Sequence, residues 1–173
     1  MRSKFLLVPA VLVAVSAPVA AFDFQSLEAA QERLFPGKKL TPFDFTLSPE
    51  QFERLKTEYK VPALRPSFKA WRSDNGDWLF LDQVYGLNDI VTYVAAVDAK
   101  SQVRGVEVLV CAEGFCDIAA PEWNGQLVGK SYGKWTPAEE VTNISGATLS
   151  TVHITEGIKK ILAIHARFLP KAG

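Results

Sequence analysis

A periodic apolar pattern near the C-terminus places the strongest constraint on the fold of this chain. Large, mostly apolar side chains recur there at spacings of three and four residues: Ile154, Ile158, Ile161, Leu162, His165 and Phe168. This spacing predicts one amphipathic helix that begins near Thr148. Because such a helix must bury its apolar stripe against another layer, the preceding chain has to supply a matching surface.

Strand patterns supply that surface from Phe68 onward. An Asp-Asn-Gly-Asp turn at 74–77 predicts a hairpin, and the alternation of apolar and polar residues favours strands on both sides of it. In the last of these strands Val106, Val108 and Val110 are expected to share one face. Strands are predicted over residues 68–72, 78–81, 90–97 and 103–110. We therefore expect an α+β fold, with a twisted, half-barrel-like antiparallel sheet packed on the C-terminal helix.

Two shorter helices are predicted in the N-terminal part of the chain. Residues 22–35 suit a short amphipathic helix that ends at Pro36-Gly37. Ser48, Pro49 and Gln51 carry the pattern of a capping box with proline at the first helical position, so a second helix should run to about Tyr59. Residues 61–65, which precede Pro66, are expected to connect it to the sheet.

The first residues of the chain are typical of a secretory signal peptide. Arg2 and Lys4 precede an apolar run, and small residues at 19–21 offer a cleavage site near Ala21. The run is too short to span a bilayer comfortably, so the processed protein is expected not to cross a membrane. The predicted organisation is a signal peptide over 1–21, an N-terminal helical extension over 22–65 and one domain over 66–170. The predicted location is periplasmic or secreted.

Charge and cysteine content narrow the possible partners and ligands. The chain has 19 basic and 19 acidic residues, so there is no electrostatic case for a nucleic-acid partner. In an oxidising compartment Cys111 and Cys116 favour a disulfide, and a redox-active dithiol is the alternative. A zinc site is not expected, because only His153 and His165 remain as further nitrogen ligands. Covalent haem and free nucleotides also lack their motifs.

The start of the C-terminal helix is rich in hydroxyl groups. The segment 143–151 reads Asn-Ile-Ser-Gly-Ala-Thr-Leu-Ser-Thr. Unpaired N–H groups and the positive end of the helix dipole would favour a phosphate at this position. Gly146 gives the backbone freedom for a close approach. The alternative is an ordinary helix cap, in which Ser145 or Thr148 satisfies the free amides.

The Ser-Gly-Ala-Thr run at 145–148, followed by Leu149 and Ser150, resembles the flavinylation motif of the FMN-binding domain family. That family includes the C subunit of the sodium-translocating NADH:quinone reductase and related Rnf and NosR-type proteins. The resemblance implies that Thr148 carries FMN through a phosphoester installed by a flavin transferase. Ser145, Gly146 and Ala147 would shape the turn, and the amides of Leu149 and Ser150 would donate to the phosphate.

Residues upstream are similar to other parts of the same family. Strands within 85–109 precede a loop in which Glu113 and Gly114 occupy the position of the family's glutamate. Glu113 is the candidate for contacting the flavin or its ribityl chain, with a solvated loop carboxylate as the alternative. Lys130 is a candidate for approaching the phosphate. The chain departs from the family pattern at two places. Thr142 stands where the family usually has aspartate, and the loop after Glu113 lacks the usual Thr-Pro-Gly.

Aromatic and histidine side chains give a second set of candidates. One large aromatic residue could stack on the isoalloxazine ring, although such residues are more often part of a core. His153 is placed near the flavin, whereas His165 on the apolar stripe is expected to be a core residue. No catalytic triad is visible. The stacking candidates are Trp78, Tyr85, Trp123 and Tyr132.

These observations predict an exported electron carrier rather than an enzyme with its own substrate. Covalent FMN would relay electrons between redox partners such as a membrane complex or a periplasmic cytochrome. The main alternative is a flavin-free accessory or interaction module of the same fold. A flavin-dependent reductase is a third possibility, but the sequence identifies no substrate pocket for it.

Overall fold

The strands form one antiparallel sheet that runs through most of the protein. The computed structural model describes residues 22–57, 65–113, 116–135 and 140–170. Within them, a seven-stranded sheet has the order β1-β7-β6-β5-β4-β2, and β3 pairs with β4 beside β2. The strands are β1 (Phe22–Asp23), β2 (Leu40–Pro42), β3 (Phe45–Thr46), β4 (Ser67–Ser73), β5 (Trp78–Tyr85), β6 (Ile90–Val97) and β7 (Val103–Cys111).

Short local connections set the register of the four longest strands. Gly76 has a φ of 86° in the turn between β4 and β5, so this position requires a residue that tolerates left-handed backbone. Asp98 begins the turn between β6 and β7, and its Oδ1 accepts hydrogen bonds from the amides of Lys100 and Gln102, each at 2.9 Å. The hairpin predicted over 74–77 is thereby confirmed.

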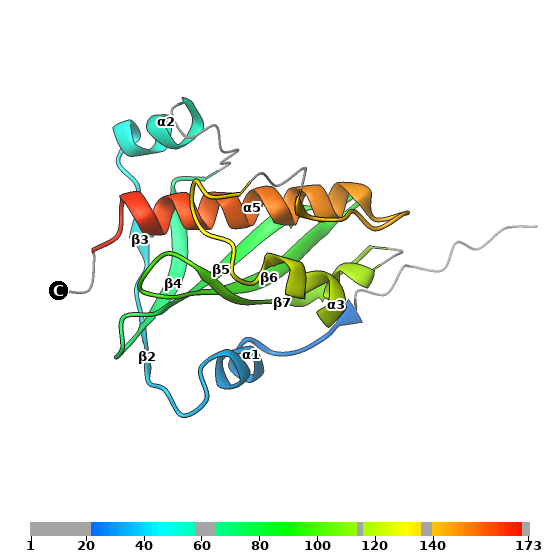
Figure 1. Ribbon diagram of the computed structural model, residues 1–173, viewed down its shortest axis with the longest axis horizontal. Coiled ribbons are helices and arrows are strands. Elements are labelled where there is room, and N and C mark those ends of the chain that lie inside the picture. The colour runs from blue at the N-terminus through cyan, green and yellow to red at the C-terminus, as the bar shows by residue number, and fades with distance from the viewer. Residues whose placement is uncertain (1–21, 58–64, 114–115, 136–139, 171–173) are drawn as a thin grey trace, which may run out of the picture.

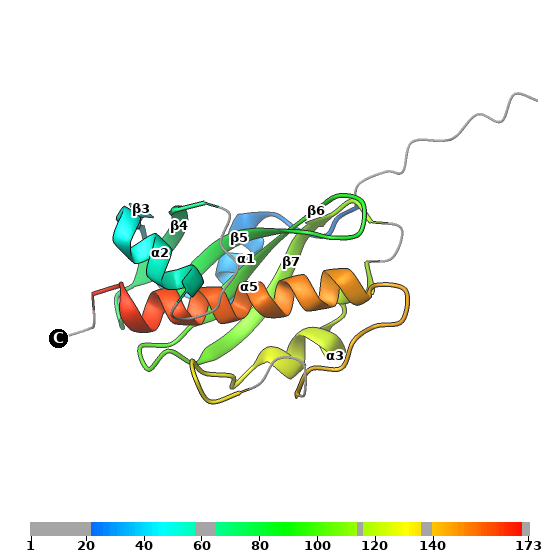
Figure 2. The ribbon, with the colours of Figure 1, turned by 90° about the horizontal axis from the view of Figure 1, so that it is seen from above.

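Helices cover both faces of the sheet. The long helix α5 (Thr148–Arg167) packs on β5 and β6, whereas α1 (Leu27–Leu34) packs on β6 and β7 from the opposite side. Figure 2 shows α5 crossing the strands along its whole length. The larger core lies under α5 and includes Ile154, Ile158 and Ile161. The predicted fold class, a twisted antiparallel sheet packed on a C-terminal helix, is confirmed.

Smaller helices occupy the rest of the chain. The helix α2 (Pro49–Thr57) begins with the predicted capping box: the Gln51 amide donates to Ser48 Oγ at 3.2 Å, and the Ser48 amide donates to Gln51 Oε1 at 2.9 Å. The predicted end of this helix near Tyr59 and the connector over 61–65 fall mostly outside the described residues. In the described residues between β7 and α5, three short helices are present: η1 (Asp117–Ala119), α3 (Pro121–Asn124) and η2 (Gly125–Leu127).

The prediction of one helix over residues 22–35 is wrong in its first part. Phe22 and Asp23 form β1 and pair with Cys111 and Val110 of β7. The helix begins only at Leu27, because Ser26 is extended and its Oγ accepts the amide of Ala29 at 3.1 Å. The residues before the first long strand therefore contribute strands as well as helices to the fold.

A β-bulge overturns the expected face of Val110. The register between β6 and β7 shifts at Thr92/Tyr93, where Thr92 pairs with Val110 but Tyr93 pairs with Val108. The extra residue reverses the alternation of side chains beyond it. Val110 consequently packs on the α1 side of the sheet, and Cys111 lies in the α5-side core with Val106 and Val108.

Candidate functional site

A tight turn leads the chain into α5. The amide of Ala147 donates to the carbonyl of Ile144 at 3.0 Å, which closes the turn through Ser145 and Gly146. Gly146 has a φ of 88°, a conformation that favours glycine. Ser145 and Gly146 are exposed, whereas the side chain of Ala147 is buried. The turn therefore presents its hydroxyl and backbone to solvent directly before the helix.

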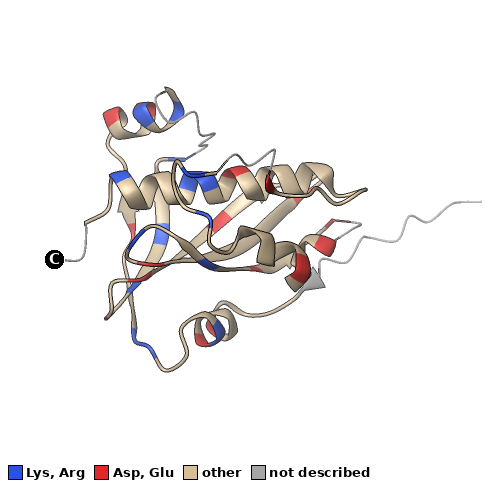
Figure 3. Ribbon diagram, viewed as in Figure 1, with Lys and Arg blue, Asp and Glu red and all other residues tan. Residues whose placement is uncertain are grey.

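The start of α5 differs chemically from the starts of the other two long helices. Ser26 caps α1, Ser48 caps α2, and both helices carry a glutamate in their first turn. The cap residue of α5 is Ala147, which has no side-chain hydrogen bond to give, and no acidic residue lies in the first turn. Figure 3 shows the beginning of α5 without charged residues. The ordinary-cap alternative is wrong for Ser145 and Thr148, because neither caps the helix.

The hydroxyl of Thr148 lies at the surface. Its side chain is exposed, and its Oγ1 makes one long hydrogen bond of 3.4 Å to the carbonyl of Ile144. Thr151, one turn further, is buried, and its Oγ1 lies 2.9 Å from Asn143 Oδ1 and 2.7 Å from the carbonyl of Thr148. Of these two threonines, only Thr148 presents a hydroxyl that can be modified without breaking buried contacts.

An apolar surface surrounds this helix start. Of six exposed large apolar side chains in the described residues, four belong to this corner. Leu149 and Val152 flank Thr148 on α5, and Tyr85 and Leu87 come from the end of β5 and the turn after it. His153 joins the two elements, because its Nδ1 donates to the carbonyl of Tyr85 at 2.5 Å. We call Tyr85, Leu87, Leu149 and Val152 the apolar rim.

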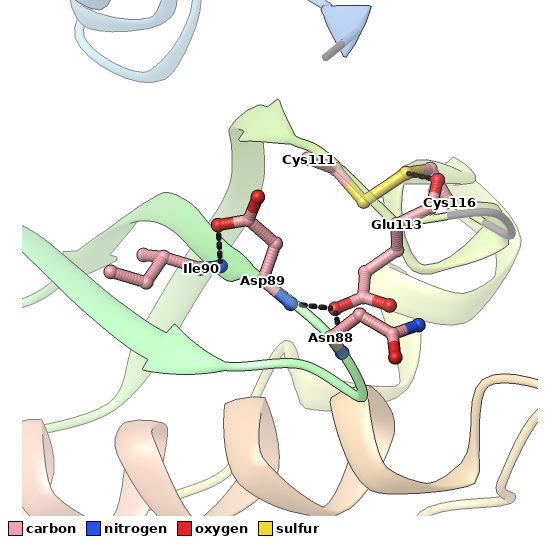
Figure 4. The surroundings of a disulfide bond; sticks show 6 residues. All are labelled: Asn88, Asp89, Ile90, Cys111, Glu113 and Cys116. Carbon is pink, nitrogen blue, oxygen red and sulfur yellow. Dashed lines mark hydrogen bonds between the residues drawn. A yellow bond between two sulfur atoms is a disulfide. The ribbon is translucent and has the colours of Figure 1, made fainter. Parts of the chain in front are cut away.

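Glu113 fixes the turn that carries part of the apolar rim. Its Oε1 accepts the amides of Asn88 at 2.9 Å and Asp89 at 2.8 Å, as Figure 4 shows. The side chain is 4% exposed, so the solvated-carboxylate alternative is wrong. A Cβ at Gly86 would lie 2.1 Å from the same oxygen, so this glycine leaves the room that Glu113 occupies. Glu113 therefore positions the turn between β5 and β6.

A disulfide closes the loop that contains Glu113. Cys111 and Cys116 are bonded with an S–S distance of 2.02 Å, and their Cα atoms are 6.2 Å apart. Cys111 is fully buried at the end of β7, whereas Cys116 is partly exposed. The structure thus contains the disulfide alternative of the sequence analysis. Gly114 lies outside the described residues.

Most of the remaining residues that the sequence suggested for flavin binding lie away from the apolar rim. Lys130 Nζ pairs with Glu140 Oε2 at 2.6 Å. Trp78 is 1% exposed in the core, and Tyr132 lies against Arg167 at the far end of α5. Trp123 is also buried, and its Nε1 donates to the carbonyl of Thr142 at 2.9 Å. Of the four aromatic stacking candidates, Tyr85 is the one that this structure places on the apolar rim.

The two histidines have different surroundings, as the sequence predicts. His165 is 5% exposed and packs its ring edge-on against Trp78 and Phe80. Its Nδ1 lies 2.8 Å from Ser101 Oγ, so it is a hydrogen-bonded core residue. His153 instead sits beside the apolar rim. The contact of His153 with Tyr85 was not predictable from sequence patterns, because it joins residues 68 positions apart.

Comparison with known proteins finds a domain family that part of this chain matches. Residues 86–163 match the model of the FMN-binding domain family, and this segment contains the turn 86–89, Glu113 and the start of α5. The predicted resemblance to that family is confirmed, and the match supports FMN as the ligand. A search of curated proteins found no match.

A solved structure has the same fold. NqrC from Shewanella oneidensis superposes with a TM-score of 0.51 at 13% sequence identity, over 78% of this chain and 82% of that chain. At this identity the likeness concerns the fold. Within the described residues, no helix is long and apolar enough to cross a membrane, and no cluster of three or more acidic, cysteine or histidine side chains could hold a metal ion.

Proposed function

We propose that this protein is an exported electron-transfer flavoprotein that carries FMN on Thr148 through a phosphoester. The observation that carries the proposal is the start of α5, which has an exposed threonine hydroxyl, no side-chain cap and no acidic residue in its first turn. Free amides and the helix dipole stabilise a phosphate at such a position. The family match over residues 86–163 supports FMN as the phosphate-bearing group.

The residues around Thr148 have different roles in binding FMN. The amides of Leu149 and Ser150 donate to the phosphate. The apolar rim shields one side of the isoalloxazine ring, and Tyr85, which is 61% exposed, offers it an aromatic face. Glu113 acts through the turn at 86–89, because within the described residues the carboxylate accepts the amides of Asn88 and Asp89 in that turn. FMN supplies the electron-transfer chemistry when it is bound.

A covalent tether suits an exported carrier. Attachment makes the local concentration of the cofactor independent of its supply outside the cytoplasm. The signal peptide predicted over residues 1–21 supports export, with redox proteins such as a membrane complex or a periplasmic cytochrome as partners. N-terminal sequencing of the protein from a periplasmic fraction tests export: a mature N-terminus near Phe22 is expected, and an intact Met1 contradicts it.

In-gel fluorescence tests the tether. Co-production with a flavin transferase should give a band that stays fluorescent after denaturation, and Thr148→Ala should lose that fluorescence while remaining folded. Ser145→Ala is the matched control, because it removes a neighbouring exposed hydroxyl and should keep the fluorescence. A fluorescent Thr148→Ala band would show that the flavin is attached elsewhere.

One observation favours the flavin-free accessory module as the second candidate. Thr142 stands where the family usually has an aspartate. In this structure its backbone amide donates to Gln126 Oε1 at 2.9 Å, so this position is tied to the segment around η2. If the wild-type protein shows only the mass of the processed polypeptide after co-production with the transferase, the accessory-module function replaces the first proposal.

A further inference from the structure

A large cavity opens between α5 and the edge of the sheet formed by β3, β4 and β5. Its volume is about 920 Å³, which lies within the usual range of small-molecule sites, roughly 300–1,000 Å³. His153 lines the end nearest the apolar rim, whereas Asp44 and Arg65 line other parts of it. The cavity extends well beyond the start of α5, where the proposed flavin tether lies.

Two residues of the cavity lining, Lys160 and Asp82, form a polar cluster with the buried Tyr93 behind them. Lys160 Nζ lies 2.9 Å from Asp82 Oδ1 and 2.7 Å from Asp82 Oδ2. Tyr93 is fully buried, and its hydroxyl donates a hydrogen bond to Asp82 Oδ2 at 2.7 Å. Burial, followed by the charge of Asp82 and this hydrogen bond, raises the pKa of Tyr93 well above 10.0. The phenol therefore stays protonated and keeps the carboxylate in place.

Within the part of the chain that the structure describes, the Lys160 ammonium has one N–H donor beyond those that Asp82 accepts. An ammonium group has three N–H donors, and within the described residues its hydrogen-bond acceptors are the two oxygens of Asp82. The residue is 8% exposed and lines the cavity. Because Asp82 already neutralises the charge of Lys160, the remaining N–H suits a neutral acceptor such as a carbonyl oxygen better than a second carboxylate.

Gly157 leaves room for this arrangement. It faces the cavity from α5, and a Cβ at this position would lie 2.1 Å from the Tyr93 hydroxyl oxygen and 3.3 Å from Asp82 Oδ2. Any side chain would displace the Tyr93–Asp82 hydrogen bond. A helix-weakening glycine in the middle of a 20-residue helix is therefore explained by the polar cluster beneath it.

The rest of the lining combines apolar side chains with polar and charged ones, and the Lys, Arg, Asp and Glu residues of the lining balance to no net charge. Phe45 and Phe68 stack at 5.4 Å between ring centroids, and further apolar residues come from β5 and β6. Three basic residues are balanced by three acidic residues, so a charged ligand has no electrostatic advantage. The balanced residues are Arg65, Lys69 and Lys160 against Asp44, Asp82 and Glu156.

We infer that this cavity is a second ligand site, which binds a small, uncharged, largely apolar ring compound whose carbonyl oxygen accepts a hydrogen bond from Lys160. The site is distinct from the flavin tether at Thr148. It does not depend on the proposed function, because its lining and polar cluster consist of the protein's own side chains.

Calorimetric titration with prodan, a neutral naphthyl ketone, tests the inference on flavin-free Thr148→Ala protein. Saturable binding of one molecule per chain is expected. Lys160→Met in the same background should weaken it about tenfold or more, as expected for loss of a hydrogen bond from a charged donor. Lys159→Met, on the same helix but outside the cavity lining, is the matched control and should bind as the parent does. No saturable binding, or unchanged binding by a folded Lys160→Met protein, overturns the inference.

A second variant covers the case in which Lys160→Met does not fold. Ser67 is an exposed residue of β4 on the cavity lining, so Ser67→Trp should fill the space and abolish binding. Thr41→Trp, at an exposed strand position outside the lining, should have no effect. The titration is then repeated on flavin-loaded wild type. Retained binding supports a separate site, whereas loss of binding shows that the flavin ring fills the cavity and overturns it.

Discussion

The start and the middle of α5 belong to one helix, but their polar side chains differ in exposure and in hydrogen-bond partners. At the start, Thr148 is exposed, its hydroxyl makes one long hydrogen bond, and no side chain caps the helix. In the middle, Lys160 is buried, ion-paired with Asp82 and enclosed by the sheet. The start of α5 therefore exposes its polar groups to solvent, whereas Lys160 in the middle forms an ion pair that joins the helix to the sheet.

This difference predicts how substitutions divide between function and stability. Breaking a buried ion pair leaves an uncompensated charge, which costs much more than the loss of an exposed hydroxyl. Changes in the middle of α5 should therefore lower the free energy of unfolding. Changes at its start should affect the cofactor and leave the free energy of unfolding nearly unchanged.

The largest effect is expected from Lys160→Met. Removing the ammonium leaves the Asp82 carboxylate without its cation, so the free energy of unfolding should fall by about 3–5 kcal/mol. Urea denaturation followed by circular dichroism measures it. Lys159→Met should change the same quantity by less than about 0.5 kcal/mol. Equal losses in the two variants would show that the buried Lys160 contributes no more to stability than the partly exposed Lys159.

Glu113→Ala should have the next largest effect. The change leaves the amides of Asn88 and Asp89 without their acceptor, which should cost about 2 kcal/mol of the free energy of unfolding. Hydrogen exchange at these two amides should accelerate, whereas Asp117→Ala, which removes an exposed carboxylate nearby, should leave both rates unchanged. Unchanged exchange in Glu113→Ala would show that the turn does not depend on this carboxylate.

Tyr93 should make stability fall in alkaline solution. Its pKa is raised by burial in the folded state, so above pH 10.0 the unfolded chain loses this proton while the folded protein keeps it. The unfolded state then binds fewer protons, and the free energy of unfolding falls by up to about 1.4 kcal/mol per pH unit. Denaturation at a series of alkaline pH values measures the slope. Tyr93→Phe should have a shallower slope, and an identical slope would contradict the assignment.

Thr148→Ala should have the smallest effect on stability. Its exposed side chain makes one hydrogen bond of 3.4 Å, so the free energy of unfolding should change by less than about 0.5 kcal/mol in flavin-free protein. Thr151→Ala, one turn away, removes a buried hydroxyl that contacts Asn143 and should cost about 1 kcal/mol. Thermal denaturation of both variants, in parallel, checks the contrast within a single turn.

Local signals made much of the fold predictable. The capping box at Ser48, the hairpin turn at Gly76 and the periodicity of α5 each depend on residues a few positions apart, and each is present in the structure. The bulge in β7 was not predictable, because an inserted residue shows itself only against the partner strand. The strand β1 was not predictable either, because its two residues form a strand by pairing with β7.

The site was predictable only where it is contiguous in the chain. The segment 145–150 carries the motif by itself, whereas Lys160 and Asp82 are 78 residues apart and neither belongs to a recognisable pattern. The sequence identified no substrate pocket for the same reason: the cavity is formed by residues from four strands and α5. The apolar rim also draws on two separate parts of the chain, so its exposure required the structure.

The packing of Glu113 over Gly86 couples the substitutions that these two distant positions can accept. Because the carboxylate fills the space in which a side chain at 86 would sit, an ancestor could gain a side chain there only after position 113 had become smaller. Related sequences should therefore vary at positions 86 and 113 together. Those with glutamate at position 113 should keep glycine at position 86.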